Sequence, residues 1–377
     1  MKIGILTQPL GTNYGGILQN YALQTALKKY GFDPFTINHY YPHFSKIMNL
    51  ASIIKRNVLK YIFRRNVILR IKPTKKEAQV ISRNIDQFVK RNINLTEKIY
   101  KSKKKIIKKY DFNTYIVGSD QVWRPKYSHY LDNFFLDFLD GNNEIKKITY
   151  AASFGVDDWE YTSEQTIKYS RLAKQFKAIS VREESGIELC RKHLDVEAVQ
   201  VLDPTMLLRK EDYIDLAKRD NIPERENLLF GYILDNSEEK NVLIEKIIKE
   251  FNLKYISGMP SNSFDLKMSK KDLSDCIFMP VTEWIAGFRD AKFVITDSFH
   301  GTIFSIIFNK PFIVFSNTNR GKARFMSLLK MFKLEDRLIT TPDFDNKLLH
   351  LDYSEINKTV DKERNKSINY LLDALQK

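Results

Sequence analysis

The sequence predicts an α/β fold in which two Rossmann-like domains meet at a cleft. The length of 377 residues suits two domains of ordinary size. Short apolar runs alternate with helical patterns along most of the chain, which indicates parallel sheets built from β-α-β units. A charged stretch over 209–227, which contains Pro223, separates two series of such runs. We therefore predict an N-terminal domain over 1–215 and a C-terminal domain over 216–377 that ends in a helix.

The first predicted unit begins at the N-terminus. A strand over 2–7 is followed by a loop over 8–16 and by a helix whose apolar positions begin at Ile17 and which stops at Gly31. A second strand follows at 35–38. Such a unit, with glycines in the loop before the helix, presents backbone N–H groups to an anion or a sugar. The loop lacks a GxGxxG pattern, so a tight turn without a ligand is the alternative.

Further apolar runs predict the remaining strands of both sheets. They lie at 114–117, 147–152, 178–181 and 198–202 in the first domain, and at 228–234, 255–257, 293–296 and 312–315 in the second. Ligands bind at the carboxyl ends of parallel strands, so the polar residues that follow these runs are the candidates for function.

Positive charge is concentrated in a predicted helical insertion at about 44–110. The whole chain has a formal net charge of +15, and the stretch 46–109 alone holds 20 Lys and Arg against three acidic residues. Apolar residues over 53–63 recur at helical spacing beside basic ones, which predicts a basic amphipathic helix. Such a helix suits either a solvated face or an anionic membrane surface. We do not expect nucleic acid as a partner, because no recognition motif accompanies the charge.

Several other classes of protein find no support in the sequence. The two cysteines, Cys190 and Cys276, cannot form a disulfide framework or a CxxC metal site. The six histidines show no metal-ligand spacing, and neither a Walker A lysine loop nor a GxSxG serine motif occurs. The apolar run at the N-terminus is too short for a signal sequence or a membrane span, so we expect a cytoplasmic protein.

The loop after the run 114–117 carries a mixture of side chains that suits a sugar. It offers a hydroxyl, a carboxylate, an amide and an indole from Ser119, Asp120, Gln121 and Trp123. Carboxylate and amide groups bind ring hydroxyls, and an aromatic face packs on the C–H side of a sugar. The alternative is structural, with Asp120 as a helix cap and Trp123 as a core residue.

Cationic side chains follow two of the predicted strands. Arg182 comes directly after the run 178–181, where its planar guanidinium would suit a phosphate or a carboxylate. An internal ion pair with Glu183 or Glu184 is the alternative. The loop after the run 312–315 supplies three more cations, Arg320, Lys322 and Arg324.

The most informative run ends in Asp297, Ser298 and His300, just before an apolar helix predicted over 303–308. His300 would lie at the N-terminal turn, where the helix dipole favours a neutral imidazole and the N–H groups favour an anionic ligand. A general acid or base is therefore expected there, with a structural histidine as the alternative. These three residues are too close in sequence to form a catalytic triad on their own.

Several of these motifs together resemble the polysaccharide pyruvyl transferase family. They are Asn13-Tyr14-Gly15-Gly16 with Gln19, the stretch from Gly118 to Trp123, Arg182-Glu183-Glu184-Ser185, Asp203-Pro204 and Ser298-Phe299-His300-Gly301. Their order and spacing match over about residues 1–330, apart from the basic insertion. The resemblance implies a GT-B-like arrangement of the two domains and the transfer of pyruvate from phosphoenolpyruvate to a sugar as a ketal.

This resemblance also implies a role for each candidate residue. His300 would be the acid or base, and no cofactor is needed because phosphoenolpyruvate is a co-substrate. The donor would contact Arg182, Ser298, Arg320, Lys322 and Arg324. The acceptor would contact Asn13, Gly15, Gly16, Ser119, Asp120, Gln121, Trp123 and Glu283. Family members have an arginine two positions before the histidine, whereas this chain has Ser298, so the other cations would have to supply that charge.

Two further interpretations remain open at this point. A GT-B glycosyltransferase with a nucleotide-sugar donor has the same two-domain layout, and Glu283 could contact its ribose. A membrane-associated carbohydrate-binding protein would turn over neither donor. If the acceptor is a lipid-linked saccharide, the basic stretch 46–109 should hold the protein at the inner face of an anionic membrane.

Overall fold

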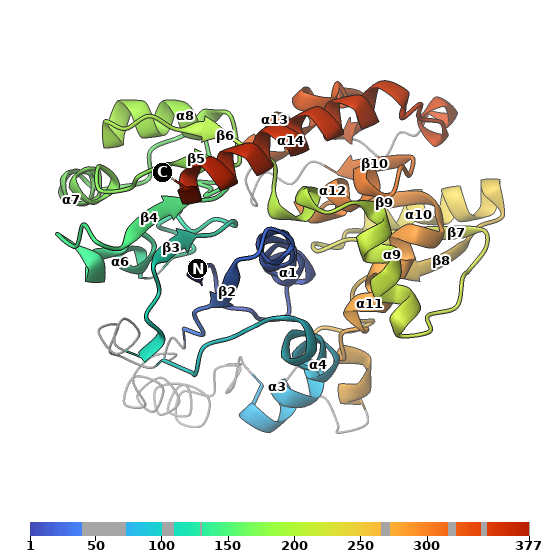
Figure 1. Ribbon diagram of the computed structural model, residues 1–377. Coiled ribbons are helices and arrows are strands. Elements are labelled where there is room, and N and C mark those ends of the chain that lie inside the picture. The colour runs from blue at the N-terminus through green and yellow to red at the C-terminus, as the bar shows by residue number, and fades with distance from the viewer. Residues whose placement is uncertain are drawn as a thin grey trace, which may run out of the picture.

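The computed structural model describes residues 1–39, 73–99, 109–128, 130–264, 272–315, 322–340 and 345–376. The chain forms two α/β domains, each built around a parallel sheet (Figure 1). This arrangement confirms the predicted fold class. The predicted amphipathic helix over 53–63 lies outside the described residues.

The N-terminal sheet has the strand order β2-β1-β3-β4. Its strands are β1 (Lys2–Leu6), β2 (Asp33–Thr36), β3 (Thr114–Val117) and β4 (Lys146–Thr149). A short parallel pair, β5 (Ser180–Val181) and β6 (Val199–Gln200), lies beyond β4 and is joined to it by isolated bridges. Because helices cover both faces of a parallel sheet, β3 is buried throughout, as its uninterrupted apolar sequence predicts.

The helices of the N-terminal half connect these strands. They are α1 (Tyr14–Lys29), α3 (Lys75–Ile81), α4 (Arg83–Asn92), α6 (Leu131–Phe134), α7 (Ser163–Ala173), α8 (Ser185–Leu189) and α9 (Lys210–Arg219). The helix α1 begins three residues before the apolar positions that predict it. Asn13 precedes it in an extended conformation and accepts from the N–H of Ile17 through its carbonyl oxygen.

The C-terminal sheet has the strand order β11-β10-β9-β7-β8. Its strands are β7 (Leu228–Tyr232), β8 (Lys254–Ser257), β9 (Ala291–Thr296), β10 (Phe312–Phe315) and β11 (Leu338–Ile339). Its helices are α10 (Glu238–Phe251), α11 (Val281–Asp290), α12 (Phe299–Ile307), α13 (Lys322–Phe332) and α14 (Ser354–Gln376). Strand β11 has only two residues, too few to form a recognisable apolar run.

The helix α12 begins four residues earlier than its apolar run predicts. Ser298 is extended and caps the helix, because its hydroxyl accepts a hydrogen bond from the N–H of Gly301 at 3.5 Å. Every residue of α12 is buried, which makes it a core helix without a solvent face. The first turn of this helix therefore carries His300 into the interior of the molecule.

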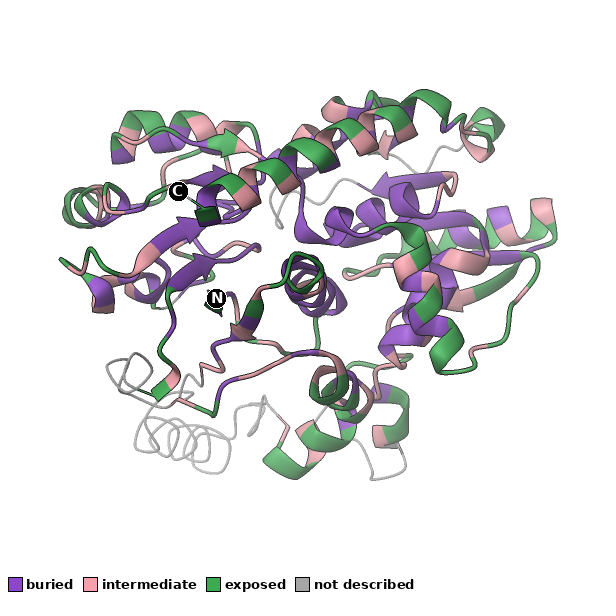
Figure 2. Cartoon of the chain, viewed as in Figure 1, coloured by how far each residue is buried: buried purple, intermediate pink, exposed green. Residues whose placement is uncertain are grey.

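A continuous apolar core joins the two domains. Tyr14 in the first turn of α1 stacks on Trp284 of α11, with ring centroids 5.2 Å apart, and its hydroxyl donates to the Met279 carbonyl at 2.9 Å. Figure 2 shows that buried residues fill the central strands of both domains and much of α1 and α12. The N-terminal end of α1 is thus fixed against the C-terminal domain.

The long helix α14 returns from the C-terminal domain to the N-terminal sheet (Figure 1). Leu371 and Leu375 join the core that contains Ile3 and Ile5 of β1. The Lys146 ammonium donates to the Leu375 carbonyl at 2.6 Å. The last helix therefore packs against the first domain and ties the two halves together. Among the residues that the structure describes, no helix is both long and apolar enough to span a membrane.

Candidate active site between the two domains

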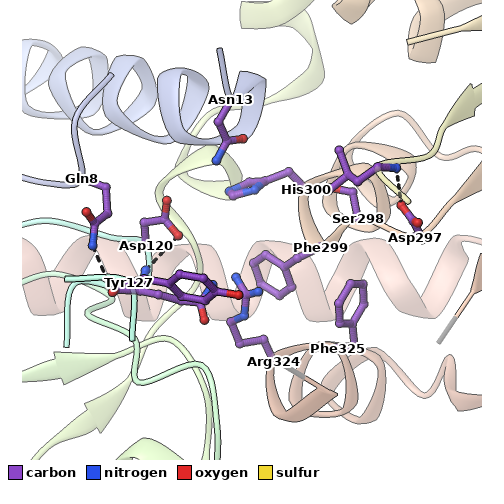
Figure 3. Close-up of a pocket in the computed structure, with 12 residues that line it drawn as sticks. Gln8, Asn13, Asp120, Tyr127, Asp297, Ser298, Phe299, His300, Arg324 and Phe325 are labelled. Atoms are coloured by element: carbon purple, nitrogen blue, oxygen red, sulfur yellow. Dashed lines mark hydrogen bonds between the residues drawn. The ribbon is translucent and has the colours of Figure 1, made fainter. Parts of the chain in front are cut away.

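A cavity of about 310 Å³ lies where the carboxyl ends of strands from both sheets face each other (Figure 3). Its N-terminal wall consists of Gln8, Asn13, Asp120, Gln121 and Tyr127. Its C-terminal wall consists of Leu234, Asp297, Ser298, Phe299, His300, Arg324 and Phe325. Figure 3 shows the His300 imidazole and the Asp120 carboxylate reaching toward the same space from opposite domains.

His300 is held in one position by its neighbours. Only 6% of the residue is exposed, and the Phe299 ring meets the imidazole edge to face. On the other side the imidazole packs against Gly15 so closely that a Cβ atom at position 15 would lie 2.0 Å from Nδ1. Tyr14 anchors this turn of α1 against the C-terminal domain. Because Gly15 has no side chain, the N-terminal end of α1 can approach the imidazole at the N-terminal end of α12.

Asp203 lies behind His300 and is fully buried at its side chain. Its Oδ2 atom is 3.5 Å from the His300 Nε2 atom and accepts hydrogen bonds from Arg182 at 2.9 Å and Ser119 at 3.2 Å. Burial alone would raise the pKa of Asp203, but the interactions with the His300 imidazole and the Arg182 guanidinium outweigh burial and hold this pKa well below its usual value. A permanent carboxylate therefore faces the imidazole.

Arg182 lies beneath the cavity and is not part of its wall. Besides its bond to Asp203, its guanidinium lies 3.8 Å from the Asp120 carboxylate and over the Phe299 ring, 4.6 Å from the centroid. The Nε and Nη2 atoms of this guanidinium are buried and have no hydrogen-bond partner among the described residues. In this conformation Arg182 interacts with the carboxylates of Asp120 and Asp203 beside the site.

Among the described residues, Arg324 of α13 is the arginine that lines the cavity directly. Its guanidinium lies 5.2 Å from the Phe299 centroid, so Phe299 contacts two arginines. Burial and the neighbouring charge of Arg182 lower the pKa of Arg324 to about 10, which still leaves it charged at neutral pH. The Ser327 hydroxyl, on the same helix, accepts from the Glu184 N–H at 3.0 Å and thereby fixes α13 to the N-terminal domain.

The N-terminal wall offers polar groups that suit hydroxyls. Asp120 adopts a left-handed backbone conformation with φ of +83°, and its Oδ1 atom accepts from the Gln121 N–H at 2.8 Å. Residues held in such conformations cluster at functional sites. Asn13 makes no side-chain cap for α1, although it occupies the N-cap position, and it lines the cavity instead. The side-chain amide oxygen of Gln121 accepts a hydrogen bond from the Arg124 guanidinium at 3.1 Å.

Some predicted site residues lie away from the cavity wall. Trp123 is fully buried, stacks on Phe135 and donates from its indole to the Phe134 carbonyl at 3.0 Å, so it is a core residue here. Glu283 forms an ion pair with Arg225 and is not in the cavity wall. Ser119 is buried and bonds to Asp203.

The remaining predictions fall partly outside the described part of the chain. Arg320 lies outside the described residues, and Lys322 is placed only as the first residue of α13. Gly16 follows Gly15 in the first turn of α1, close to the Asn13 amide.

Sequence reasoning assigned no role to several residues that the fold brings to the site. Asp203 belongs to a motif that was recognised, but its contacts with Ser119 and His300 join positions 84 and 97 residues away, which no local pattern reports. Gln8 and Tyr127 follow the predicted strands in loops rich in other polar residues. Position after a strand was the only available signal for them.

Comparison with known proteins supports these assignments of fold and family. A family model described as polysaccharide pyruvyl transferase matches residues 13–319. Among curated proteins, none matches the chain.

Two solved structures are similar in fold. UDP-GlcNAc 2-epimerase from Neisseria meningitidis, bound to UDP-GlcNAc, has a TM-score of 0.50 at 9% identity, with 100% of each chain covered. UDP-GlcNAc 2-epimerase from Methanocaldococcus jannaschii has a TM-score of 0.47 at 17% identity, covering 100% of this chain and 99% of that one. At 9% identity the similarity to the Neisseria meningitidis structure concerns the fold alone, which is GT-B-like. Since the family model spans most of the chain and includes Asn13, Asp120 and His300, the chain belongs to the polysaccharide pyruvyl transferase family.

Proposed function

We propose that this enzyme transfers the pyruvyl group of phosphoenolpyruvate to two hydroxyls of a sugar in a polysaccharide precursor and so forms a ketal. The observation that carries the proposal is the joint placement of His300, Arg324 and Asp120 around one small cavity. An acid or base, a permanent cation and a hydroxyl-binding carboxylate are the groups that this reaction requires. Membership of the family supports pyruvyl transfer, and the nature of the donor is our inference.

We assign the donor to the C-terminal part of the cavity. Phosphoenolpyruvate carries a phosphate and a carboxylate, and the Arg324 guanidinium can bind either group through paired hydrogen bonds. The N-terminal ends of α1 and α12 converge on His300 and add the positive ends of two helix dipoles. Arg324 and the two helix ends supply the positive potential that would attract the anionic donor. In this chain they would replace the arginine of other family members, because Ser298 stands at that position.

The reaction balances with the groups present. One acceptor hydroxyl adds to C2 of phosphoenolpyruvate while C3 takes up a proton, inorganic phosphate departs, and the second hydroxyl then adds to C2. The two hydroxyls lose two protons, of which one balances the proton gained by C3 and the other leaves with phosphate. We assign His300 as the group that delivers the proton to C3, with the Asp203 carboxylate 3.5 Å from its Nε2 atom.

We assign the acceptor to the N-terminal wall. Asp120, Asn13 and Gln121 line the cavity with a carboxylate and two amides. Carboxylate and amide groups of this kind fix ring hydroxyls through hydrogen bonds. The exposed Tyr127 ring, which lies 4.9 Å from the Arg124 guanidinium, offers the aromatic face that Trp123 cannot provide from the core.

A donor screen tests the proposal. The wild-type enzyme should release phosphate from phosphoenolpyruvate in the presence of neutral sugar acceptors, and His300→Ala should lower that rate by about 10² to 10⁴-fold. His350→Ala, at an exposed position, is the matched control and should keep the full rate. Release of a nucleoside diphosphate from a nucleotide sugar, without turnover of phosphoenolpyruvate, would favour a glycosyltransferase and reject the proposal.

A further inference from the structure

A second and larger cavity of about 920 Å³ adjoins the site. Leu234 lines both cavities, and the loop before α1 also lines both, with Gln8 and Asn13 on one side and Leu10 and Thr12 on the other. The second cavity extends between α3, α10 and the carboxyl end of β8. A ligand longer than one sugar could therefore pass from the first cavity into the second.

The wall segment at Leu234, which the two cavities share, is fixed by hydrogen bonds. The Asp297 carboxylate is fully buried and accepts from the backbone N–H groups of Leu234 at 2.6 Å and Asp235 at 3.0 Å. The Lys240 ammonium donates to the same carboxylate at 2.7 Å. The two bonds from the backbone fix the chain at Leu234, and the Lys240 bond holds the Asp297 carboxylate that accepts them. The wall shared by the two cavities therefore has a fixed position.

The wall of the second cavity differs in chemistry from that of the first. Its polar side chains are mostly amides and hydroxyls, among them Asn236, Asn241 and Asn262, and its aromatic rings include Tyr255 and Phe278. Among the described residues that line it there is no lysine, arginine or histidine, and Asp86 is the one carboxylate. Neutral hydrogen-bonding groups beside aromatic faces match uncharged sugar rings, whereas a diphosphate would need cations.

We propose that the second cavity binds further uncharged sugar residues of the acceptor, beyond the sugar that receives the pyruvyl group. This inference rests on the proposed function, which places the reacting sugar in the first cavity. It assigns acceptor contacts to α10 and the end of β8 in the C-terminal domain. The predicted consequence is a preference for oligosaccharides over monosaccharides, set by residues remote from His300.

The test measures binding without any donor, so it does not depend on pyruvyl transfer. The probes are neutral hexose and N-acetylhexosamine mono-, di- and tetrasaccharides on a glycan array, and the strongest tetrasaccharide is then titrated calorimetrically. Asn241→Trp, on the exposed surface of α10 that lines the cavity, should fill part of it. Lys246→Trp is the control, because it is exposed on the same helix and does not line the cavity.

We expect the wild-type protein to bind the tetrasaccharide at least about tenfold more tightly than the monosaccharide. Asn241→Trp should remove this gain and leave monosaccharide binding intact, whereas Lys246→Trp should keep the gain. Three results would each overturn the inference: no dependence on glycan length, equal behaviour of the two variants, or binding of uridine diphosphate that Asn241→Trp abolishes. Failure of phosphoenolpyruvate turnover beside an intact length preference would instead reject the proposed function alone.

Discussion

The contact between Gly15 and His300 makes the position of the imidazole depend on the absence of a side chain in the neighbouring helix. Gly15→Ala should push the imidazole out of place and lower kcat/KM by at least tenfold, with an overpacking cost of about 1–3 kcal/mol in stability. Steady-state rates and urea unfolding measure the two effects. Gly4→Ala is a matched control, since its Cβ would lie 2.9 Å from the Phe112 ring in the core. That control should lose stability but keep its rate, and equal loss of activity in both variants would show that the contact has no special role.

The depressed pKa of Asp203 makes a prediction about acid stability. Because its pKa in the folded state lies below the usual unfolded value of about 3.9, Asp203 stabilises the fold at any pH above that value. This contribution shrinks as the pH falls through the window between the unfolded and the folded pKa. Asp203→Asn should therefore be less stable than wild type at both pH 7 and pH 5. The difference should narrow below about pH 4.

Urea unfolding of both proteins at several pH values checks this. A difference in the free energy of unfolding that grows as the pH falls below 4 would contradict the assignment.

The sequence predicts the position of a site residue correctly where one strand and the residues that follow it contain the whole pattern. The local pattern predicts His300 at a helix N-terminus, and the structure confirms that position. Trp123 was expected at a sugar site, although its position after a strand is equally compatible with the core. A single sequence does not report that Phe135 and the Phe134 carbonyl are available to bury it.

At the scale of elements, local apolar runs predicted the strands well. The bounds of β3 and β10 agree with the runs 114–117 and 312–315, because both strands are buried along their whole length. The docking of α14 on the other domain was not predictable. A helix pattern shows which face is apolar, but the partner of that face depends on contacts across the whole chain.

The packing of α14 gives a prediction about stability. Leu371 is 2% exposed and packs in the core of the N-terminal sheet. Leu371→Ala should lower the free energy of unfolding by about 2–5 kcal/mol, because it removes buried methyl groups and leaves a cavity. Asn369→Ala, at an exposed position of the same helix, should change it by no more than about 0.5 kcal/mol. Equal and small effects of both changes would show that α14 is not needed to hold the domains together.

At the scale of the whole molecule, the charge distribution suggests where the enzyme works. Most of the basic stretch 46–109 lies outside the described residues, so its membrane role stays a prediction from the sequence. We propose that it binds an anionic membrane surface when the acceptor is lipid-linked. Exposed charges are screened over roughly 8 Å at physiological ionic strength, so vesicle binding should require anionic lipid and weaken as salt rises.

Flotation with anionic and neutral vesicles tests this proposal. Replacing the basic residues of the predicted helix with glutamine should lower binding to anionic vesicles and leave turnover of a soluble acceptor unchanged. These residues are Lys55, Arg56, Lys60, Arg64 and Arg65. Unchanged vesicle binding by the variant would show that the charge serves solubility or packing instead.

The central claim is that His300 delivers a proton to C3 of phosphoenolpyruvate during ketal formation. Carrying out the reaction in D₂O tests it most directly, because the new methyl group must take its third hydrogen from an exchangeable site. We predict a ketal product with one deuterium in each pyruvyl methyl group, detected by mass spectrometry, and almost no product with His300→Ala. A product without deuterium, or one formed equally fast by His300→Ala, would contradict the claim.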